Sequence, residues 1–168
     1  SNTTRFMRSL VFLISTLSLF AGCKESVFQS LKKTDELFVY EGLPHPGREN
    51  PSFEKEKKRK DVRQIDGHWF YDAKVKAAGD TRDRLMNLLF DESGFGVPGP
   101  NTPPKDCGPF HPDYAISWKS EGEENYLMIC YTCSEAKLIG VGKTATYEVY
   151  SNLQEVLSEF QSKRPPKQ

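Results

Sequence analysis

The amino-acid sequence predicts an α+β fold, with a single antiparallel sheet and helices packed on one of its faces. Two alternating runs, residues 113–120 and 125–132, flank the polar segment "EGEE", which is the pattern of a β-hairpin. Two other segments, 80–90 and 151–163, carry apolar residues at helical spacing. The chain has 168 residues, which fits one domain with a core of its own.

The first part of this domain reads as strand, helix and strand. Residues 36–41, "ELFVYE", form a short β-prone run that ends at the glycine and prolines of "GLPHPG". A helix is expected to begin at Pro51 with Asn50 as its cap, and its mixed charge run, 54–63, indicates a solvated helix or a linker. Alternation over 67–77 then predicts a strand.

The segment 80–90 predicts a helix that is capped by Asp80 or Thr81 and whose leucines face the sheet. Further strands are expected over 136–142 and 144–150. The last helix, 151–163, starts with a capping-box pattern formed by Ser151 and Gln154.

The N-terminal residues have the pattern of an export signal. Arg5 and Arg8 precede an apolar run over 10–20, which is too short to span a bilayer as a stable anchor. Small residues and Cys23 follow in "LFAGC". This stretch resembles the lipobox of bacterial lipoproteins, which implies that Cys23 carries lipid and becomes the mature N-terminus. An ordinary secretory signal or an uncleaved anchor is the alternative.

The expected organisation follows from this signal. It comprises a signal peptide (1–22, of which 1–6 are a tag remnant or an alternative start), a lipidated tether (23–35), one α+β domain (36–163) and a flexible tail (164–168). The resemblance implies an exported, membrane-anchored protein on the periplasmic side of the cell envelope. Its partners would be the membrane, through the lipid, and an unknown protein or envelope component.

The charge balance excludes one class of partner. The chain has 23 Lys and Arg against 23 Asp and Glu, so its net charge is zero. Nucleic-acid binding depends mainly on excess positive charge. We therefore expect no nucleic acid as partner.

The chemically distinctive residues are three cysteines and one histidine: Cys107, His111, Cys130 and Cys133. If the hairpin turns at Gly122 and Glu123, Trp118 lies opposite Leu127 and Pro112 lies opposite Cys133. The predicted register therefore brings Cys107 and His111, at the end of the Pro- and Gly-rich stretch 91–112, close to Cys133.

Three chemistries are open for this set. In an oxidising compartment, a disulfide from Cys107 to Cys133 or Cys130 would pin the long loop, and this is the favoured reading. The four residues also have the composition of a Cys₃His zinc site. A redox Cys-x-x-Cys pair needs a bend between Cys130 and Cys133, and the segment has no Gly or Pro to provide one. Ser134 stands where haem attachment requires histidine, which excludes haem.

Catalysis has little support in the sequence. Cys107 and His111 could form a nucleophile pair, but no third group that would orient the histidine is recognisable. The stretch "FHPDYAISW" followed by "CYTCSEAKL" resembles a family of small exported bacterial proteins, and this resemblance implies no activity. We therefore expect a lipid-anchored binding or structural module without cofactor, and the alternative is a metal-binding or thiol-redox accessory protein.

Overall fold

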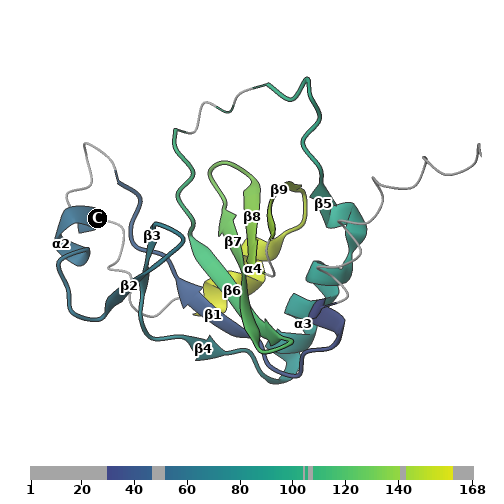
Figure 1. Ribbon diagram of the computed structural model, residues 1–168, viewed down its shortest axis with the longest axis horizontal. Coiled ribbons are helices and arrows are strands. Elements are labelled where there is room, and N and C mark those ends of the chain that lie inside the picture. The colour runs from purple at the N-terminus through teal and green to yellow at the C-terminus, as the bar shows by residue number, and fades with distance from the viewer. Residues whose placement is uncertain (1–29, 47–51, 104, 106–107, 141–142, 161–168) are drawn as a thin grey trace, which may run out of the picture.

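The computed structural model describes residues 30–46, 52–103, 105, 108–140 and 143–160. A seven-stranded antiparallel sheet forms its centre (Figure 1). In spatial order its strands are β4 (Val75–Lys76), β1 (Phe38–Glu41), β6 (Tyr114–Ser120), β7 (Glu123–Cys130), β8 (Glu135–Gly140), β9 (Lys143–Val149) and β5 (Phe95–Gly96). Both edge strands have only two residues, which leaves little unpaired backbone for edge-to-edge association.

Helices cover one face of this sheet, as predicted. They are α3 (Gly79–Phe90) and α4 (Leu153–Leu157), and a short 3-10 helix, η2 (Ser158–Phe160), continues α4. Leu85 and Leu89 of α3 are fully buried in the same cluster as Trp118 and Ile129 of the sheet. The α+β class with an antiparallel sheet is therefore confirmed.

The core begins before the first strand. Residues 30–32 are helical, and Leu31 is fully buried in the main cluster. The indole Nε1 of Trp118 donates a hydrogen bond to Ser30 Oγ over 3.0 Å. Part of the segment that the sequence assigns to the tether thus packs against the sheet.

The opposite face carries a second, two-stranded sheet, of which the sequence predicted one strand, within the run 67–77. It consists of β2 (Val62–Ile65) and β3 (His68–Tyr71), and α2 (Ser52–Glu56) precedes it. Asp66 and Gly67 join the two strands with φ of 48° and 79°, as a two-residue hairpin turn of the primed type requires. The expected helix over the charge run is thus wrong beyond Glu56.

The central hairpin has a register that differs from the predicted one by two residues. Trp118 pairs with Asn125 rather than Leu127. The reason is the turn, which uses Glu121 and Gly122 with φ of 54° and 83°, one position earlier than expected. A shift of two residues keeps every side chain on its predicted face.

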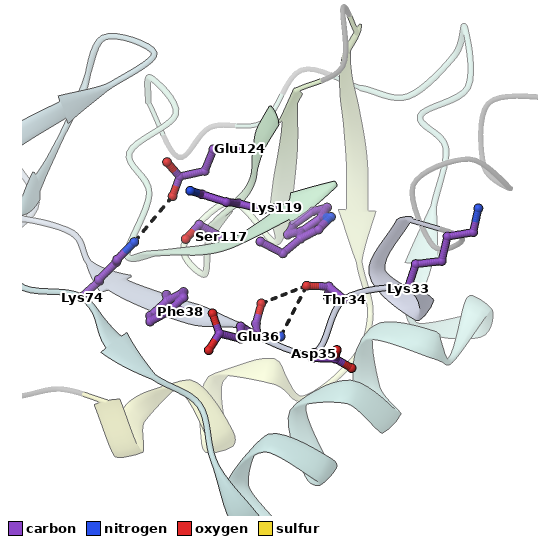
Figure 2. Close-up of a pocket in the computed structure, with 10 residues that line it drawn as sticks. Lys33, Thr34, Asp35, Glu36, Phe38, Lys74, Ser117, Lys119 and Glu124 are labelled. Atoms are coloured by element: carbon purple, nitrogen blue, oxygen red, sulfur yellow. Dashed lines mark hydrogen bonds and ion pairs between the residues drawn. The ribbon is translucent and has the colours of Figure 1, made fainter. Parts of the chain in front are cut away.

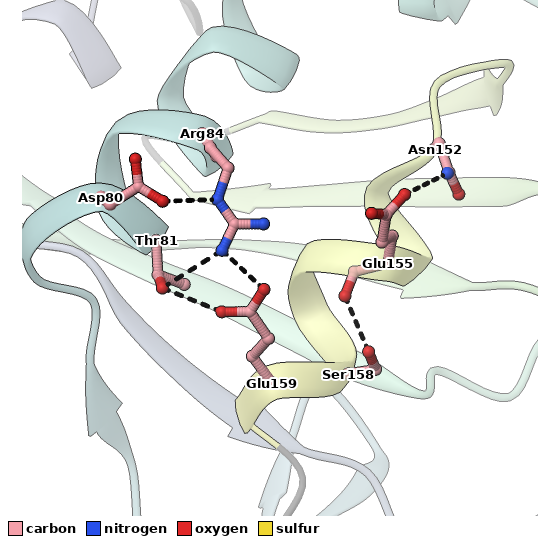
Figure 3. A network of polar contacts seen from close by, with 7 residues as sticks. All are labelled: Asp80, Thr81, Arg84, Asn152, Glu155, Ser158 and Glu159. Atoms are coloured by element: carbon pink, nitrogen blue, oxygen red, sulfur yellow. Dashed lines mark hydrogen bonds and ion pairs between the residues drawn. The ribbon is translucent and has the colours of Figure 1, made fainter.

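Neither predicted helix cap forms. The N-cap of α3 is Ala78, which makes no side-chain cap hydrogen bond, and the Asp80 carboxylate instead accepts from Arg84 Nε over 3.0 Å (Figure 3). The N-cap of α4 is Asn152, and the predicted Ser151 cap instead leaves its hydroxyl buried without a hydrogen-bond partner. Arg84 also donates to Glu159 Oε1 over 2.6 Å and so joins α3 to η2.

Candidate functional site

The "FHPD" segment anchors the ends of three strands. The Asp113 amide donates to the Ile129 carbonyl, and the Asp113 carbonyl accepts from the Gly42 amide, each over 2.7 Å. Its carboxylate accepts from the Tyr131 amide over 2.9 Å. A Cβ on Gly42 would collide with the Pro112 carbonyl, so glycine permits this close crossing. Asp113 therefore fixes where β1 ends and where β7 turns.

His111 stabilises the crossing between Gly42 and Pro112. Its ring is buried, and Nε2 donates to the Leu43 carbonyl over 2.8 Å. The ring lies 4.8 Å from the His45 ring, between centroids, and 5.8 Å from that of Phe53. His45 donates from Nδ1 to the Pro46 carbonyl over 3.0 Å. Because a backbone carbonyl holds Nε2 of His111, this nitrogen is not free to bind a metal.

The third histidine, His68, lies in β3 and contacts the same segment through Phe110. The two ring centroids are 5.3 Å apart, edge to face, and Lys137 Nζ lies 4.3 Å from the Phe110 ring centroid. Burial, together with the Lys137 charge, lowers the pKa of His68. His68 is therefore neutral at pH 7 and contributes to packing.

The cysteines lie at a turn. Cys130 ends β7 as a fully buried free thiol, and Cys133 is buried within the turn 131–134. The expectation of an extended chain between them is wrong, because Ser134 adopts a φ of 47° and its amide donates to the Tyr131 carbonyl. Cys107 and Cys23 lie outside the described residues, so the Cys107 disulfide and the Cys23 lipid stay predictions.

Lys105 ties the Pro- and Gly-rich loop to the same turn. Its Nζ donates to the Cys133 carbonyl over 2.5 Å and to the Ser134 carbonyl over 3.2 Å. It also forms an ion pair of 2.7 Å with Glu148, in which the two side chains are 25% and 15% exposed. Within the part of the chain that the structure describes, no group of three or more His, Cys, Asp or Glu could hold a metal ion.

A surface hollow lies near the start of β1 and the end of β6, away from Asp113 (Figure 2). Its volume is about 630 Å³, and Phe38 and Ser117 contribute to its wall. Six charged side chains also line it: Lys33, Asp35, Glu36, Lys74, Lys119 and Glu124. They come from the segment before β1, the segment before β4, and the hairpin of β6 and β7.

Ser117 is the unusual residue of this wall. It pairs with Phe38 on one side and with Tyr126 on the other, in the middle of the sheet. Its side chain is fully buried, and its hydroxyl has no hydrogen-bond partner among the residues that the structure describes. A buried hydroxyl without a partner is costly, and native proteins contain few of them. The wall of the hollow therefore contains a buried polar group that makes no hydrogen bond to any described residue.

Lys74 lies between an aromatic ring and a carboxylate at the edge of the hollow. Its Nζ is 4.3 Å from the Phe38 ring centroid and 3.8 Å from Glu124 Oε1. Burial, together with the hydrogen bond and charge of Glu124, raises the pKa of Tyr126 to about 12. At the mouth, the hydrogen bond and positive charge of Lys76 lower the pKa of Glu36. The hollow thus combines both signs of charge with an aromatic ring.

Sequence reasoning missed the hollow because its residues come from segments that are far apart in the chain. The alternation of "DYAISW" placed Ser117 in a strand, but only the pairing with Phe38 shows which residues surround it. A serine among buried strand residues was the one local signal.

The comparisons with known proteins add no relative. No family model, curated protein or solved structure matches the chain. Among the described residues, no helix is both long enough and apolar enough to cross a membrane.

Proposed function

We propose that this protein is a lipid-anchored binding module of the bacterial envelope, whose ligand occupies the hollow at Phe38 and Ser117. The observation that carries the binding role is the Ser117 hydroxyl, which lies buried in the wall of the hollow and has no hydrogen-bond partner among the described residues. A bound ligand would supply that partner and relieve the cost of leaving the group unsatisfied.

The anchor rests on the sequence. A basic start, a short apolar run and "LFAGC" precede Cys23. Lys33, which lines the hollow, follows Cys23 by ten positions in the chain. A chain of that length spans at most about 35 Å. Lipid on Cys23 would therefore hold the hollow close to the membrane surface, where it would meet ligands of the envelope.

Two readouts on the full chain test this proposal. For the anchor, the chain is expressed in a bacterium that is fed an alkyne-bearing palmitate. The label should appear on the wild-type protein and disappear in Cys23→Ser, and a label that persists in Cys23→Ser would contradict the anchor.

For the binding role, hydrogen exchange is measured with and without a low-molecular-mass extract of bacterial envelopes. Protection should be confined to peptides that cover residues 33–38, Lys74 and 117–124. Unchanged exchange in these peptides would contradict binding at the hollow.

A further inference from the structure

Building on the proposed function, we infer that the ligand of the hollow is a neutral polyhydroxylated molecule of the size of one or two sugar units. The volume of about 630 Å³ lies within the range of small-molecule sites, about 300–1,000 Å³. The charge balance, the hydrogen-bonding groups and the aromatic ring of the hollow each favour a neutral polyhydroxylated ligand.

The charged groups around the hollow are balanced. Three ammonium groups and three carboxylates line it, and they come from the same three segments. An anion would meet carboxylates and a cation would meet ammonium groups, and like charges at an interface are costly. A hydroxyl group both donates and accepts hydrogen bonds, so one neutral ligand can satisfy both kinds of side chain.

The internal contacts leave specific groups open to such a ligand. Lys74 and Glu124 are 3.8 Å apart, which is too long for a hydrogen bond. Thr34 Oγ1 is engaged, because it donates to the Glu36 carbonyl over 3.1 Å and accepts from the Glu36 amide over 3.4 Å. Ser117 differs, since its buried hydroxyl has no partner among the described residues. A ligand hydroxyl would bond to Ser117 after the side chains that cover it shift, and the same ligand would bridge Lys74 and Glu124.

Phe38 supplies the apolar part of the site. The ring is half-buried, and Lys74 Nζ lies 4.3 Å from its centroid. Ring faces carry negative potential and attract positive charge. The C–H groups on the face of a sugar ring are both apolar and weakly positive, so they can displace Lys74 Nζ from this ring and pack there while the hydroxyls reach the polar wall.

Isothermal titration calorimetry on the full chain tests this inference. The chain is kept in lauryldimethylamine oxide, a detergent without a sugar headgroup. The probes are glucose, N-acetylglucosamine and cellobiose, with sodium acetate, sodium phosphate and methylammonium chloride as charged comparisons. We expect at least one sugar to bind saturably with little dependence on salt, because a neutral ligand has no charge to screen.

Two serine variants locate the binding. Ser117→Ala should weaken sugar binding at least tenfold. Ser151→Ala removes another buried hydroxyl without a partner, at a position that does not line the hollow, and should leave binding unchanged.

The outcomes separate this inference from the proposed function. Salt-sensitive binding of acetate, phosphate or methylammonium that is lost in Ser117→Ala would overturn the polyhydroxylated class but leave a binding hollow. If no probe binds in a manner that depends on Ser117, this inference is wrong. If, in addition, the envelope extract fails to protect residues 117–124, the binding role itself is wrong.

Discussion

Ser117 in β6 lies directly opposite Phe38 in β1, and this pair joins a fully buried hydroxyl to a half-buried aromatic ring in the wall of one hollow. In the described part of the chain the hydroxyl has no partner, although a hydrogen bond to any neighbouring backbone group would lower the cost of burying it. At this pair, the unsatisfied hydroxyl lowers the stability of the free protein, whereas the proposed binding role requires that hydroxyl.

Ser117→Ala should stabilise the free protein. The substitution removes an unsatisfied buried hydroxyl, whose burial costs about 1–3 kcal/mol, at the expense of a small gap. We expect the free energy of unfolding in urea to rise by about 1 kcal/mol or to stay unchanged. Ser151→Ala removes the other described serine hydroxyl that is buried without a partner, and it should likewise raise the free energy of unfolding or leave it unchanged. A clear loss of stability in Ser117→Ala alone would show that the hydroxyl is bonded in solution.

Gly42→Ala should destabilise the protein by about 1–3 kcal/mol. The new methyl group would press on the Pro112 carbonyl, and overpacking a tight contact has a cost of this size. Gly99→Ala is the matched control, because its methyl group would meet only Thr102 Oγ1 at 3.8 Å. Urea denaturation compares the two variants, and equal stability would contradict the close crossing at Asp113.

Lys105→Met should release the long loop from the turn at Cys133. The variant loses an ion pair and two hydrogen bonds to carbonyls. Because the side chains are partly exposed, we expect a loss of about 1 kcal/mol. The cleavage rate in limited proteolysis of the loop should rise. Lys58→Met, at an exposed position, is the control and should change neither quantity.

The contact between α3 and η2 should weaken in acid. The hydrogen bond from Arg84, followed by that from Thr81, lowers the pKa of Glu159 below its usual 4.5. A carboxyl group with a lowered pKa in the folded state contributes stability that is present above the unfolded value and is lost as pH falls through the folded one. Stability measured from pH 7 to pH 3 should therefore fall less in Glu159→Gln than in the wild type.

Arg84→Met provides the second arm of that experiment. In this background Glu159→Gln should change the acid part of the curve much less, because Arg84 is gone and only the hydrogen bond from Thr81 remains. An unchanged effect of Glu159→Gln in both backgrounds would show that another group controls the pKa.

A count of thiols should find one free thiol and one disulfide among Cys107, Cys130 and Cys133. With Cys23 replaced by serine, alkylation of the denatured chain should modify one thiol before reduction, Cys130, and three after it. This count follows from the predicted bond between Cys107 and Cys133 and from the free thiol of Cys130. Three reactive thiols without reductant, together with stoichiometric zinc, would favour the metal alternative.

Helices and strands whose position depends on a short run of residues were predicted correctly. The stripe of Leu85 and Leu89 identified α3, and the alternation around Trp118 identified β6. The hairpin register depends on which two residues form the turn, and these are Glu121 and Gly122. Several neighbouring residues are polar, so composition alone did not show which of them turn. β2 escaped prediction because Arg63 and Gln64 are exposed and continue a charged run.

The candidate site could be predicted only in part. The predicted register brought "FHPD" close to the end of β7, and Asp113 does bond to Tyr131 there. The role of His111 depends on Leu43, a distant loop residue whose position no local pattern specifies. The hollow depends on pairing between β1 and β6 and on the absence of a partner for Ser117, and neither property is written in a short segment.

The most direct test of the binding role is differential scanning calorimetry of the wild type and Ser117→Ala, each with and without the low-molecular-mass envelope extract. A ligand that binds only the folded state raises its melting temperature. We predict that Ser117→Ala melts at or above the wild type without extract and below it with extract. Equal shifts of both proteins on addition of the extract would contradict a binding site at Ser117.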